Sequence, residues 1–370
     1  MKKSLGIYIH IPFCIKKCGY CDFCSFAGKG SEDMRCYTDE LCRRIRDWSS
    51  DGYTVDTVYF GGGTPSLLDA SHTERIMRSV FDCSDVSTDA EITLECNPAT
   101  ADRAHLYSLR SLGINRLSIG LQSTDDRELA LLGRAHSFAD FVACFNDARA
   151  AGFDNISADL MYGIPDQTLE SLERSVLTLC DISPEHVSAY GLTVEDGTDF
   201  HRNRNTLKLA DDDGQAAMYL RLSELLAENG YKKYEISNFS RKGKESRHNL
   251  RYWNGKDYIG FGIAAHSYVN GVRFGNSRDL RAFLCGEDIT EEQEVLTEDE
   301  KRLEYVMLRL RLACGIDTLE YKELFGSELI NDSPIIKKYI DTGFMRTDGR
   351  HVSFTDKGFL VSNILISELI

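Results

Sequence analysis

Short runs of β-branched and aliphatic residues alternate with amphipathic stretches over the first 190 residues of the chain. The short runs predict six strands, at residues 6–11, 57–60, 91–95, 116–120, 155–160 and 186–190. The stretches between them have the spacing of amphipathic helices, at residues 34–48, 66–81, 101–112, 138–150 and 169–180. Such alternation predicts parallel βα units, which form part of a barrel or a doubly wound sheet.

Residues suited to ligand binding stand where each of the first five predicted strands ends. They are Cys14, the segment Gly-Gly-Gly-Thr-Pro at 61–65, Glu95 with Asn97-Pro98, Gln122 and Asp159. In a βα barrel, the carboxyl ends of the strands form one face, and active sites are built there. The pattern therefore favours a partial barrel of six βα units with a ligand site at this face.

The pattern changes after residue 190. Helices are predicted at 211–229, 297–313 and 333–342, with an aromatic- and glycine-rich stretch at 234–276 and an acidic run at 287–300. Residues 344–354 predict a hairpin around Asp348-Gly349, and a last helix follows. We therefore expect an α/β chain with three parts: a partial (β/α)6 barrel at 1–195, a connecting region at 196–290, and a winged-helix-like α+β domain at 291–370.

Charge and hydropathy narrow the classes of partner. The 43 basic and 58 acidic residues give a net charge of −15, which would repel nucleic acid. No run reaches the roughly 20 apolar residues that a membrane helix needs, and the first residues lack the apolar core of a signal peptide. We therefore expect a cytoplasmic protein with reduced thiols. Seven cysteines stand singly in apolar contexts and predict small buried side chains: Cys36, Cys42, Cys83, Cys144, Cys180, Cys285 and Cys314.

Three cysteines stand close together, and they indicate a metal centre. Cys14, Cys18 and Cys21 have the spacing C-x3-C-x2-C, and soft thiolates at this spacing suit three irons of a [4Fe-4S] cluster. The fourth iron would then lack a protein ligand, and an open metal position serves chemistry. The alternative is a structural zinc site with Cys24 as a fourth ligand.

The cysteine spacing, together with the glycine segment after the second strand, resembles the radical SAM superfamily. In that superfamily, S-adenosylmethionine chelates the open iron, and the reduced cluster cleaves it to a 5′-deoxyadenosyl radical. Longer segments resemble the oxygen-independent coproporphyrinogen III oxidase group, and within it the HemW-type haem chaperones. These segments are residues 8–13, 14–23, 61–68, 94–98, 113–126, 132–136, 159–165 and 248–253.

The resemblance implies a set of contacts to S-adenosylmethionine. The positions that match are Tyr8, Gly62, Gly63, Thr64, Glu95, Gln122, Arg134 and Asp159. These residue types fit such roles, because an arginine pairs bidentately with a carboxylate, and carboxylates accept hydrogen bonds from ribose hydroxyls.

The segment His-Asn-Leu-Arg-Tyr-Trp at 248–253 resembles a motif of the chaperone branch. A histidine can ligate haem iron, and aromatic rings can stack on a porphyrin, so the resemblance makes His248 a candidate haem ligand. The alternative is that His248 is a hydrogen-bonded residue and that Tyr252 and Trp253 are core aromatics.

Two features favour the chaperone over the oxidase. The oxidases carry an N-terminal extension that reaches the active site, whereas seven residues precede Tyr8. The oxidases also have a fourth cysteine two positions after the third, where this chain has Phe23, and Cys24 follows one residue later. Cys24 is then an accident, a redox-sensitive thiol or a ligand that closes the cluster.

The resemblance implies haem as cargo, delivered to haem-accepting proteins that include membrane-bound enzymes, and an electron donor such as flavodoxin or ferredoxin. The first alternative is an oxidase that decarboxylates the propionates of coproporphyrinogen III by radical chemistry. The second is a radical enzyme that acts on haem itself.

Overall fold

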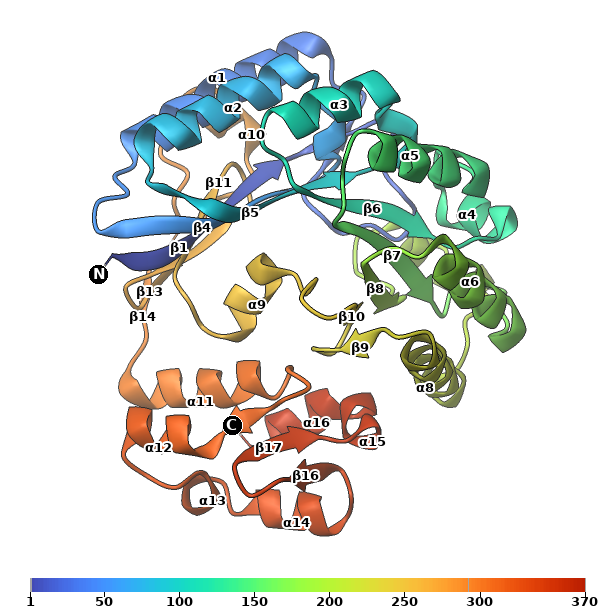
Figure 1. The fold of residues 1–370 in the computed structure, drawn as a ribbon, viewed down its shortest axis with the longest axis vertical. Coiled ribbons are helices and arrows are strands. Elements are labelled where there is room, and N and C mark those ends of the chain that lie inside the picture. The colour runs from blue at the N-terminus through green and yellow to red at the C-terminus, as the bar shows by residue number, and fades with distance from the viewer. Residues whose placement is uncertain (1, 292, 370) are drawn as a thin grey trace.

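The computed structural model describes residues 2–291 and 293–369, which form a curved twelve-stranded sheet and a smaller C-terminal unit (Figure 1). The middle of the sheet has six parallel strands that neighbour one another in chain order. They are β1 (Lys3–Ile11), β4 (Tyr53–Gly62), β5 (Val86–Cys96), β6 (Arg116–Gln122), β7 (Ile156–Tyr162) and β8 (His186–Gly191). The six predicted strands and the parallel βα organisation are confirmed, and the sheet stays open because β1 and β8 do not pair with each other.

Short strands extend the sheet at both edges. Beyond β1 lie β11 (Tyr258–Phe261), which is parallel to it, and then the antiparallel strands β12 (His266–Val269), β13 (Val272–Gly275) and β14 (Glu294–Val295). Beyond β8 lies β10 (Asn238–Ser240), which is antiparallel to β8, and then β9 (Lys232–Lys233), which is antiparallel to β10. Two further strands, β2 (Phe13–Cys14) and β3 (Phe26–Ala27), pair with each other on either side of the cysteine segment. The region 196–290, which we expected to be connecting, thus contributes strands to both edges.

Helices cover the outer face of the sheet (Figure 1). They are α1 (Ser31–Asp47), α2 (Ala70–Cys83), α3 (Arg103–Ser111), α4 (Asp126–Leu132), α5 (Phe138–Ala150), α6 (Leu169–Ile182) and α8 (Asp212–Glu228). The helix predicted from residue 66 begins later, because η1 (Pro65–Leu67) forms a 3-10 turn and Asp69 caps α2 by accepting from the amides of Ser71 and His72. The remaining short helices of this part are η2 (Pro98–Thr100), α7 (Asp199–Arg202), η3 (Arg204–Thr206) and α10 (Leu280–Leu284).

One helix, α9 (Arg247–Trp253), lies on the inner side of the curved sheet (Figure 1). It is held against β4 by an ion pair between Arg251 and Asp56 and by a hydrogen bond of 2.9 Å between His248 Nδ1 and Thr57 Oγ1. The helix therefore closes the barrel at the end opposite the carboxyl ends of the strands.

The C-terminal unit has its own hydrophobic core and a three-stranded sheet of β15 (Ile316–Asp317), β17 (His351–Phe354) and β16 (Met345–Thr347). Its helices are α11 (Glu298–Arg309), α12 (Thr318–Phe325), α13 (Leu329–Asp332), α14 (Ile335–Asp341), α15 (Asp356–Leu360) and α16 (Ser362–Ser367). The predicted hairpin is confirmed as β16 and β17, and the helix predicted at 297–313 ends at Arg309. The predicted linker 287–300 holds β14 and the first turn of α11, and its residue 292 lies outside the described residues.

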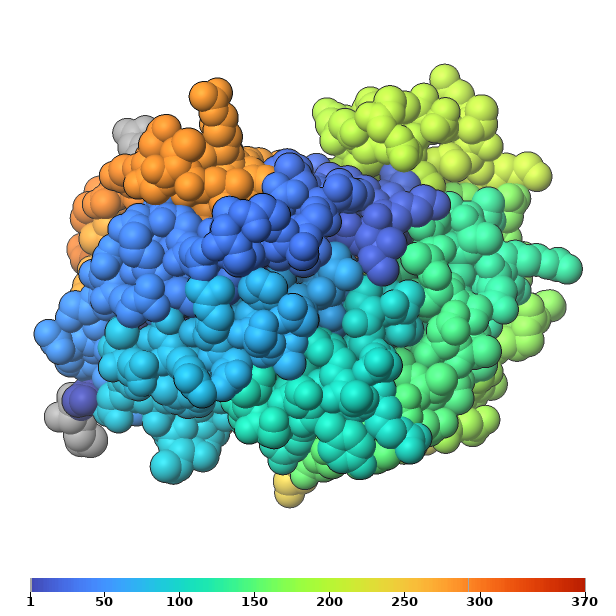
Figure 2. Space-filling model, turned by 90° about the horizontal axis from the view of Figure 1, so that it is seen from above, coloured from blue at the N-terminus to red at the C-terminus, as the bar shows by residue number. Residues whose placement is uncertain are grey.

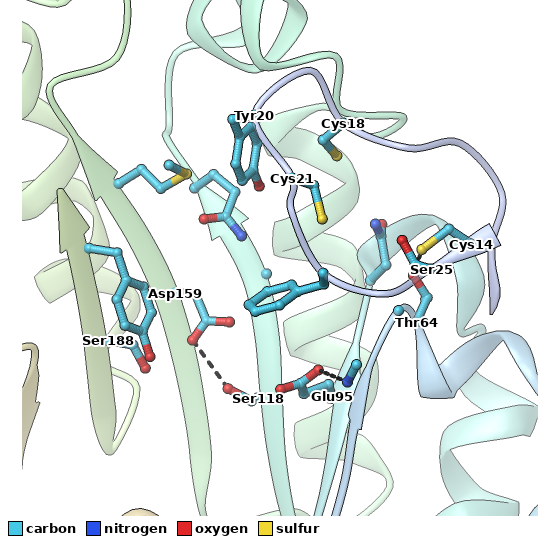
Figure 3. A pocket seen from close by; sticks show the side chains of 18 of the residues that line it. Cys14, Cys18, Tyr20, Cys21, Ser25, Thr64, Glu95, Ser118, Asp159 and Ser188 are labelled. Carbon is cyan, nitrogen blue, oxygen red and sulfur yellow. Dashed lines mark hydrogen bonds between the residues drawn. The ribbon is translucent and has the colours of Figure 1, made fainter. Parts of the chain in front are cut away.

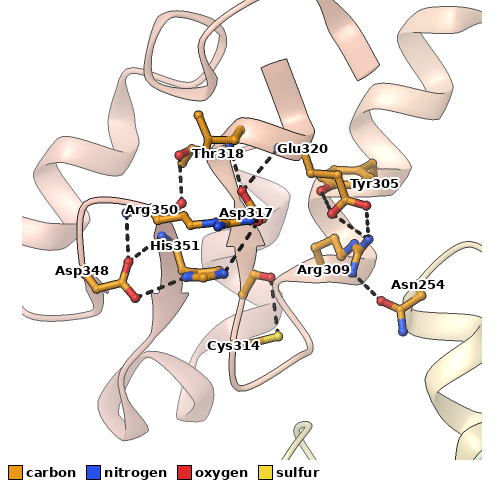
Figure 4. A network of polar contacts seen from close by, with 12 residues as sticks. Asn254, Tyr305, Arg309, Cys314, Asp317, Thr318, Glu320, Asp348, Arg350 and His351 are labelled. Atoms are coloured by element: carbon orange, nitrogen blue, oxygen red, sulfur yellow. Dashed lines mark hydrogen bonds and ion pairs between the residues drawn. The ribbon is translucent and has the colours of Figure 1, made fainter. Parts of the chain in front are cut away.

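A polar network joins this unit to α9 (Figure 4). Arg309 donates to both carboxylate oxygens of Glu320, at 2.8 and 2.9 Å, and to the amide oxygen of Asn254, which follows α9. Arg350 donates to Asp317 at 2.6 and 2.9 Å within the same network. The C-terminal unit thus rests on the helix that closes the barrel.

Two expectations about single cysteines are wrong, because Cys285 and Cys314 are exposed, whereas Cys42 and Cys144 are buried as predicted. Both exposed thiols follow a helix end, where an apolar sequence neighbourhood does not ensure burial. Among the described residues, no helix is long and apolar enough to cross a membrane.

Candidate functional site

The carboxyl ends of the parallel strands surround a cavity of about 490 Å³ (Figure 3). Because side chains alternate between the two faces of a strand, every second residue points into the cavity. On β6 these are Arg116, Ser118, Gly120 and Gln122, while Leu117, Ile119 and Leu121 are fully buried in the core beneath the helices. The same alternation brings Asp159 and Met161 of β7 and Ser188 and Tyr190 of β8 to the cavity.

The cysteine segment forms a loop over the mouth of the cavity. Seen from above, the blue N-terminal segment lies beside the yellow-green segment near residue 200 (Figure 2). The two are joined by a hydrogen bond of 2.9 Å from the Phe200 amide to the Gly19 carbonyl. The sulfurs of Cys14, Cys18 and Cys21 belong to the cavity wall and lie on the same side of this loop (Figure 3).

Polar groups from other elements contact these sulfurs. The Thr64 hydroxyl donates to Cys14 Sγ at 3.5 Å, and Arg134 Nη1 donates to Cys18 Sγ at 3.7 Å. Within residues 2–291 and 293–369, no three His, Cys, Asp or Glu side chains converge closely enough to hold one metal ion. A cluster has a different requirement, because each thiolate binds a separate iron and the sulfurs stand further apart.

Cys24 does not join the three sulfurs. Its side chain packs against the hydrophobic core and is absent from the cavity wall, and burial raises the pKa of its thiol. Its carbonyl oxygen is bonded to His10 Nε2 at 2.8 Å. This placement does not favour a fourth ligand to a cluster or a zinc ion.

The glycine segment after β4 allows the cysteine loop to approach closely. A Cβ on Gly63 would lie 2.7 Å from the carbonyl oxygen of Phe13 and 2.9 Å from its amide nitrogen, which real Cβ atoms do not tolerate. Gly62 has a φ of +113°, which favours glycine, and a Cβ there would lie 2.4 Å from the His10 ring. Both glycines are thus needed for the packing, and both line the cavity with Thr64.

Glu95 lies at the end of β5 in an enclosed position. Its carboxylate accepts hydrogen bonds from the Tyr59 hydroxyl at 2.9 Å and from the Gly62 amide at 3.1 Å. Burial is the main cause that raises the pKa of Glu95, to about 7, and the nearby charge of Asp159 adds to it. Burial also raises the pKa of Asp159, which accepts a hydrogen bond of 3.1 Å from Ser118.

Gln122 and Arg134 come together beside the cysteine loop. Gln122 has a φ of +74° at a point where the pairing of β6 with β7 shifts register, so its side chain is redirected at the strand end. Arg134 follows α4 and donates to the Gly120 carbonyl at 2.9 Å, while its buried Nε has no partner among the described residues. An unpartnered donor of this kind suits an anionic ligand group.

Seven of the eight residues predicted to contact S-adenosylmethionine line this one cavity, and Tyr8 does not. The Tyr8 hydroxyl is bonded to His10 Nδ1 at 3.0 Å, and its ring stacks on Tyr59. Tyr8 thus lies behind the wall that Tyr59 forms.

His248, the predicted haem ligand, is also outside the cavity wall. It is 1% exposed, its Nδ1 is bonded to Thr57, and its Nε2 lies 2.8 Å from the Tyr252 hydroxyl. Burial lowers the pKa of His248 to about 3, so the ring is neutral. Both nitrogens already have partners in this structure.

Several wall residues were missed by the sequence analysis. They are Lys16, Lys17, Tyr59, Arg116, Ser118, Ser188, Tyr190 and Asn249. The strand residues among them stand at even-numbered spacings along their strands, as Arg116 and Ser118 do on β6 and Ser188 and Tyr190 on β8, and this period-two spacing could have identified them.

Comparisons with known proteins agree with this arrangement. The model of the Radical SAM superfamily matches residues 8–179, and the model of the HemN C-terminal domain matches residues 296–361. The chain is 34% identical over 368 residues to the heme chaperone HemW of Bacillus subtilis (strain 168), covering 96% of each chain. The chain belongs to the heme chaperone HemW family.

The HemW of Escherichia coli (strain K12) is 33% identical over 374 residues, covering 98% of this chain and 97% of that one. Among solved structures, the coproporphyrinogen III oxidase HemN from Escherichia coli, a radical SAM enzyme, superposes with a TM-score of 0.86. It is 23% identical, covering 100% of this chain and 90% of that chain, and it confirms the predicted fold. The predicted resemblance to radical SAM proteins and HemW is therefore confirmed over the whole length.

Proposed function

We propose that this HemW family member is a haem chaperone of the cytoplasm, which binds haem and transfers it to haem-accepting proteins, membrane-bound enzymes among them. The observation that carries the proposal is the full-length similarity to heme chaperones, 31–36% identical at the family level. The cavity adds the means to hold the cofactors that the radical SAM similarity implies.

The cavity residues fit a [4Fe-4S] cluster and S-adenosylmethionine. Cys14, Cys18 and Cys21 would hold the cluster, since three thiols face one side of the loop while Cys24 packs elsewhere. A cluster bound in this way, reduced by a donor such as flavodoxin or ferredoxin, supplies an electron for cleavage of S-adenosylmethionine.

The protein side chains would orient the cofactor. The unpartnered Nε of Arg134 suits the carboxylate of S-adenosylmethionine. Gly62, Gly63 and Thr64 at the end of β4 would contact the cofactor through their backbone. Glu95 and Asp159 lie deeper and would accept hydrogen bonds from ribose hydroxyls. Gln122 closes the same wall, and Tyr8 supports it through Tyr59.

His248 stays the sequence-based prediction for the haem ligand, and the structure sets a condition on it. An iron at Nε2 would replace the hydrogen bond of 2.8 Å to Tyr252, and α9 would have to move to admit a porphyrin to a side chain that is 1% exposed. A matched pair of variants, His248→Gln and His201→Gln, tests this, because His201 lies on the exposed helix α7.

The deciding experiment gives the anaerobically reconstituted protein either haem or coproporphyrinogen III. For a chaperone we expect saturable haem binding, transfer of haem to an acceptor without its own haem, and an unchanged mass of coproporphyrinogen III in the presence of S-adenosylmethionine and reductant. Loss of two propionate carboxyl groups as CO2 would instead identify an oxidase.

The cluster ligands are tested in the same preparations. The triple variant of Cys14, Cys18 and Cys21 to Ala should lose the visible absorbance, whereas Cys24→Ala should retain it together with cleavage of S-adenosylmethionine. Retained absorbance in the triple variant would disprove the ligand assignment.

A further inference from the structure

Arg116 is a charged side chain at the inner end of the cavity for which neither the fold nor the proposed cofactor contacts provide a role. It is the first residue of β6 and one of the largest fully buried side chains of the chain, with an exposure of 2%. It faces the cavity in the same row as Gln122, which lies six residues nearer the mouth. At about 3.3 Å per residue, the two backbone positions are about 20 Å apart.

The guanidinium of Arg116 has no partner among the described residues. It forms no ion pair and no hydrogen bond with any of them, and its Nε is completely buried without an acceptor. The neighbouring Thr93 on β5, its register partner, also has an unpartnered hydroxyl. Burying an unpaired cation is costly, so such a group calls for a partner that the chain itself does not supply.

The other buried arginine of the barrel shows the contrast. Arg251 is 3% exposed, and it is paired with Asp56 and donates to the Asp257 carbonyl at 3.0 Å. The charge of Arg251 is thus paired within the fold, where it lies on α9 against β4, although its Nε, like that of Arg116, has no acceptor among the described residues. Arg116 instead faces open volume.

The groups around Arg116 do not neutralise it at contact distance. Glu95 and Asp159 lie higher in the cavity and are bonded to Tyr59, Gly62 and Ser118. On the other side are His186 and His248, both buried and with the pKa lowered, so neither supplies negative charge. The buried carboxylate of Glu91, two residues before Thr93 on β5, accepts from the amides of Arg247 and His248 and does not pair with Arg116 either. Arg116 therefore has no carboxylate at contact distance among the described residues.

We propose that Arg116 anchors a carboxylate of a ligand that enters this cavity. A guanidinium binds a carboxylate with two parallel hydrogen bonds, and an enclosed apolar surround strengthens them. Two sources have this chemistry: a propionate of haem, and the amino-acid carboxylate of S-adenosylmethionine, which would then bind Arg116 in place of Arg134. The haem source rests on the proposed haem chaperone function, and the second source rests on the cofactor that the radical SAM similarity implies.

The test measures binding of each carboxylate ligand beside an analogue in which the carboxylate is absent or blocked. Haem is compared with haem dimethyl ester in detergent, and S-adenosylmethionine with 5′-methylthioadenosine, using reconstituted wild type, Arg116→Met and Arg116→Lys. Arg127→Met on the exposed side of α4 controls for the change in net charge.

We expect Arg116→Met to weaken one of the two carboxylate ligands roughly tenfold or more and to leave its analogue unchanged. The affinity of Arg116→Lys should lie between those of the wild type and Arg116→Met, because lysine keeps the positive charge but lacks the two parallel N–H donors of the guanidinium. The melting temperature of Arg116→Met should be equal to or higher than that of the wild type, since an unpaired buried charge is removed.

Other outcomes overturn the proposal. Equal weakening of ligand and analogue, or no weakening of either ligand, would show that Arg116 does not bind a carboxylate. A lower melting temperature with unchanged binding would make it a counter-charge for Glu95 and Asp159. If the wild type binds no haem, the proposed function fails, and the S-adenosylmethionine arm still decides the role of Arg116.

Discussion

Glu95 lies between Tyr59 and Gly62 in the cavity wall, where it is partly buried, and this position sets its protonation. Its pKa of about 7 lies well above the ordinary value of 4.5, because burial disfavours the carboxylate more than its two hydrogen bonds stabilise it. Arg116 is the opposite case, because a permanently charged side chain lies at a buried position. Both residues indicate that the cavity is organised for charged ligands.

The raised pKa of Glu95 predicts how stability depends on pH. Between pH 4.5 and about 7, the folded protein holds a proton on Glu95 that the unfolded chain has lost, so the free energy of unfolding falls as the pH rises. A pKa shift of this size contributes at most about 3 kcal/mol to the free energy of unfolding. Glu95→Gln should remove this decline and be the more stable protein at pH 8.

The measurement is urea unfolding of the cofactor-free protein at pH 5 and pH 8. Glu235, whose pKa burial also raises to about 7, titrates in both proteins and cancels in the comparison. Glu298→Gln, on the exposed first turn of α11, serves as control. Identical pH dependence in wild type and Glu95→Gln would contradict the assignment.

At the scale of elements, the site depends on how β4 meets the cysteine loop. The Gly63 amide donates to the Ile11 carbonyl and the Thr64 amide to the Phe13 carbonyl, both at 2.8 Å, so β4 continues the pairing with the chain that leads into the loop. The absence of side chains at the glycines makes this approach feasible.

Gly63→Ala should displace the cysteine loop. The added Cβ would meet backbone atoms of Phe13 at 2.7 and 2.9 Å, and backbone cannot move aside as a flexible side chain can. We expect a loss of about 1–3 kcal/mol in stability and a lower ratio of iron to protein after anaerobic reconstitution.

Gly30→Ala is the matched control, because a Cβ at Gly30 meets nothing within 4 Å and its φ of −90° suits alanine. Iron content and thermal unfolding of the two variants are compared. A full iron complement in Gly63→Ala would show that the loop tolerates the shift.

At the scale of the whole molecule, the barrel and the C-terminal unit share an interface beside β9. Lys233 of β9 lies over the rings of Tyr219 and Phe359, at 5.3 and 4.6 Å, and pairs with Asp356. Backbone bonds support the contact, with the Ala313 amide donating to the Tyr234 carbonyl at 2.9 Å. The Lys233 side chain therefore connects α8 of the barrel with α15 of the C-terminal unit.

Lys233→Met should loosen the C-terminal unit by about 1–2 kcal/mol, because the cation is mostly enclosed between two rings. Hydrogen exchange should then become faster in α15 and α16 and stay unchanged in β4–β7. Lys232→Met, an exposed neighbour on the same strand, should have no such effect. Uniform acceleration in both units would instead indicate a single cooperative body.

The sequence by itself determined the positions of the six strands along the chain, the helices between them, the hairpin at residues 344–354 and the family. These features are local, since periodicity over five to fifteen residues reports which face of an element is buried. The cysteine spacing and the polar residues at the strand ends also come from the sequence. Their convergence on one face follows from parallel strand direction alone.

The tertiary structure decided what local patterns do not contain. The edge strands β9 to β14 have two to four residues, too few for a period to show, and they exist because they pair with neighbouring strands. Cys24 stands three residues after Cys21 yet turns into the core, and His248 meets Thr57 across 191 positions of sequence. Whether Arg116 is paired or unpaired depends on which distant side chains surround it, and only the folded chain brings those together.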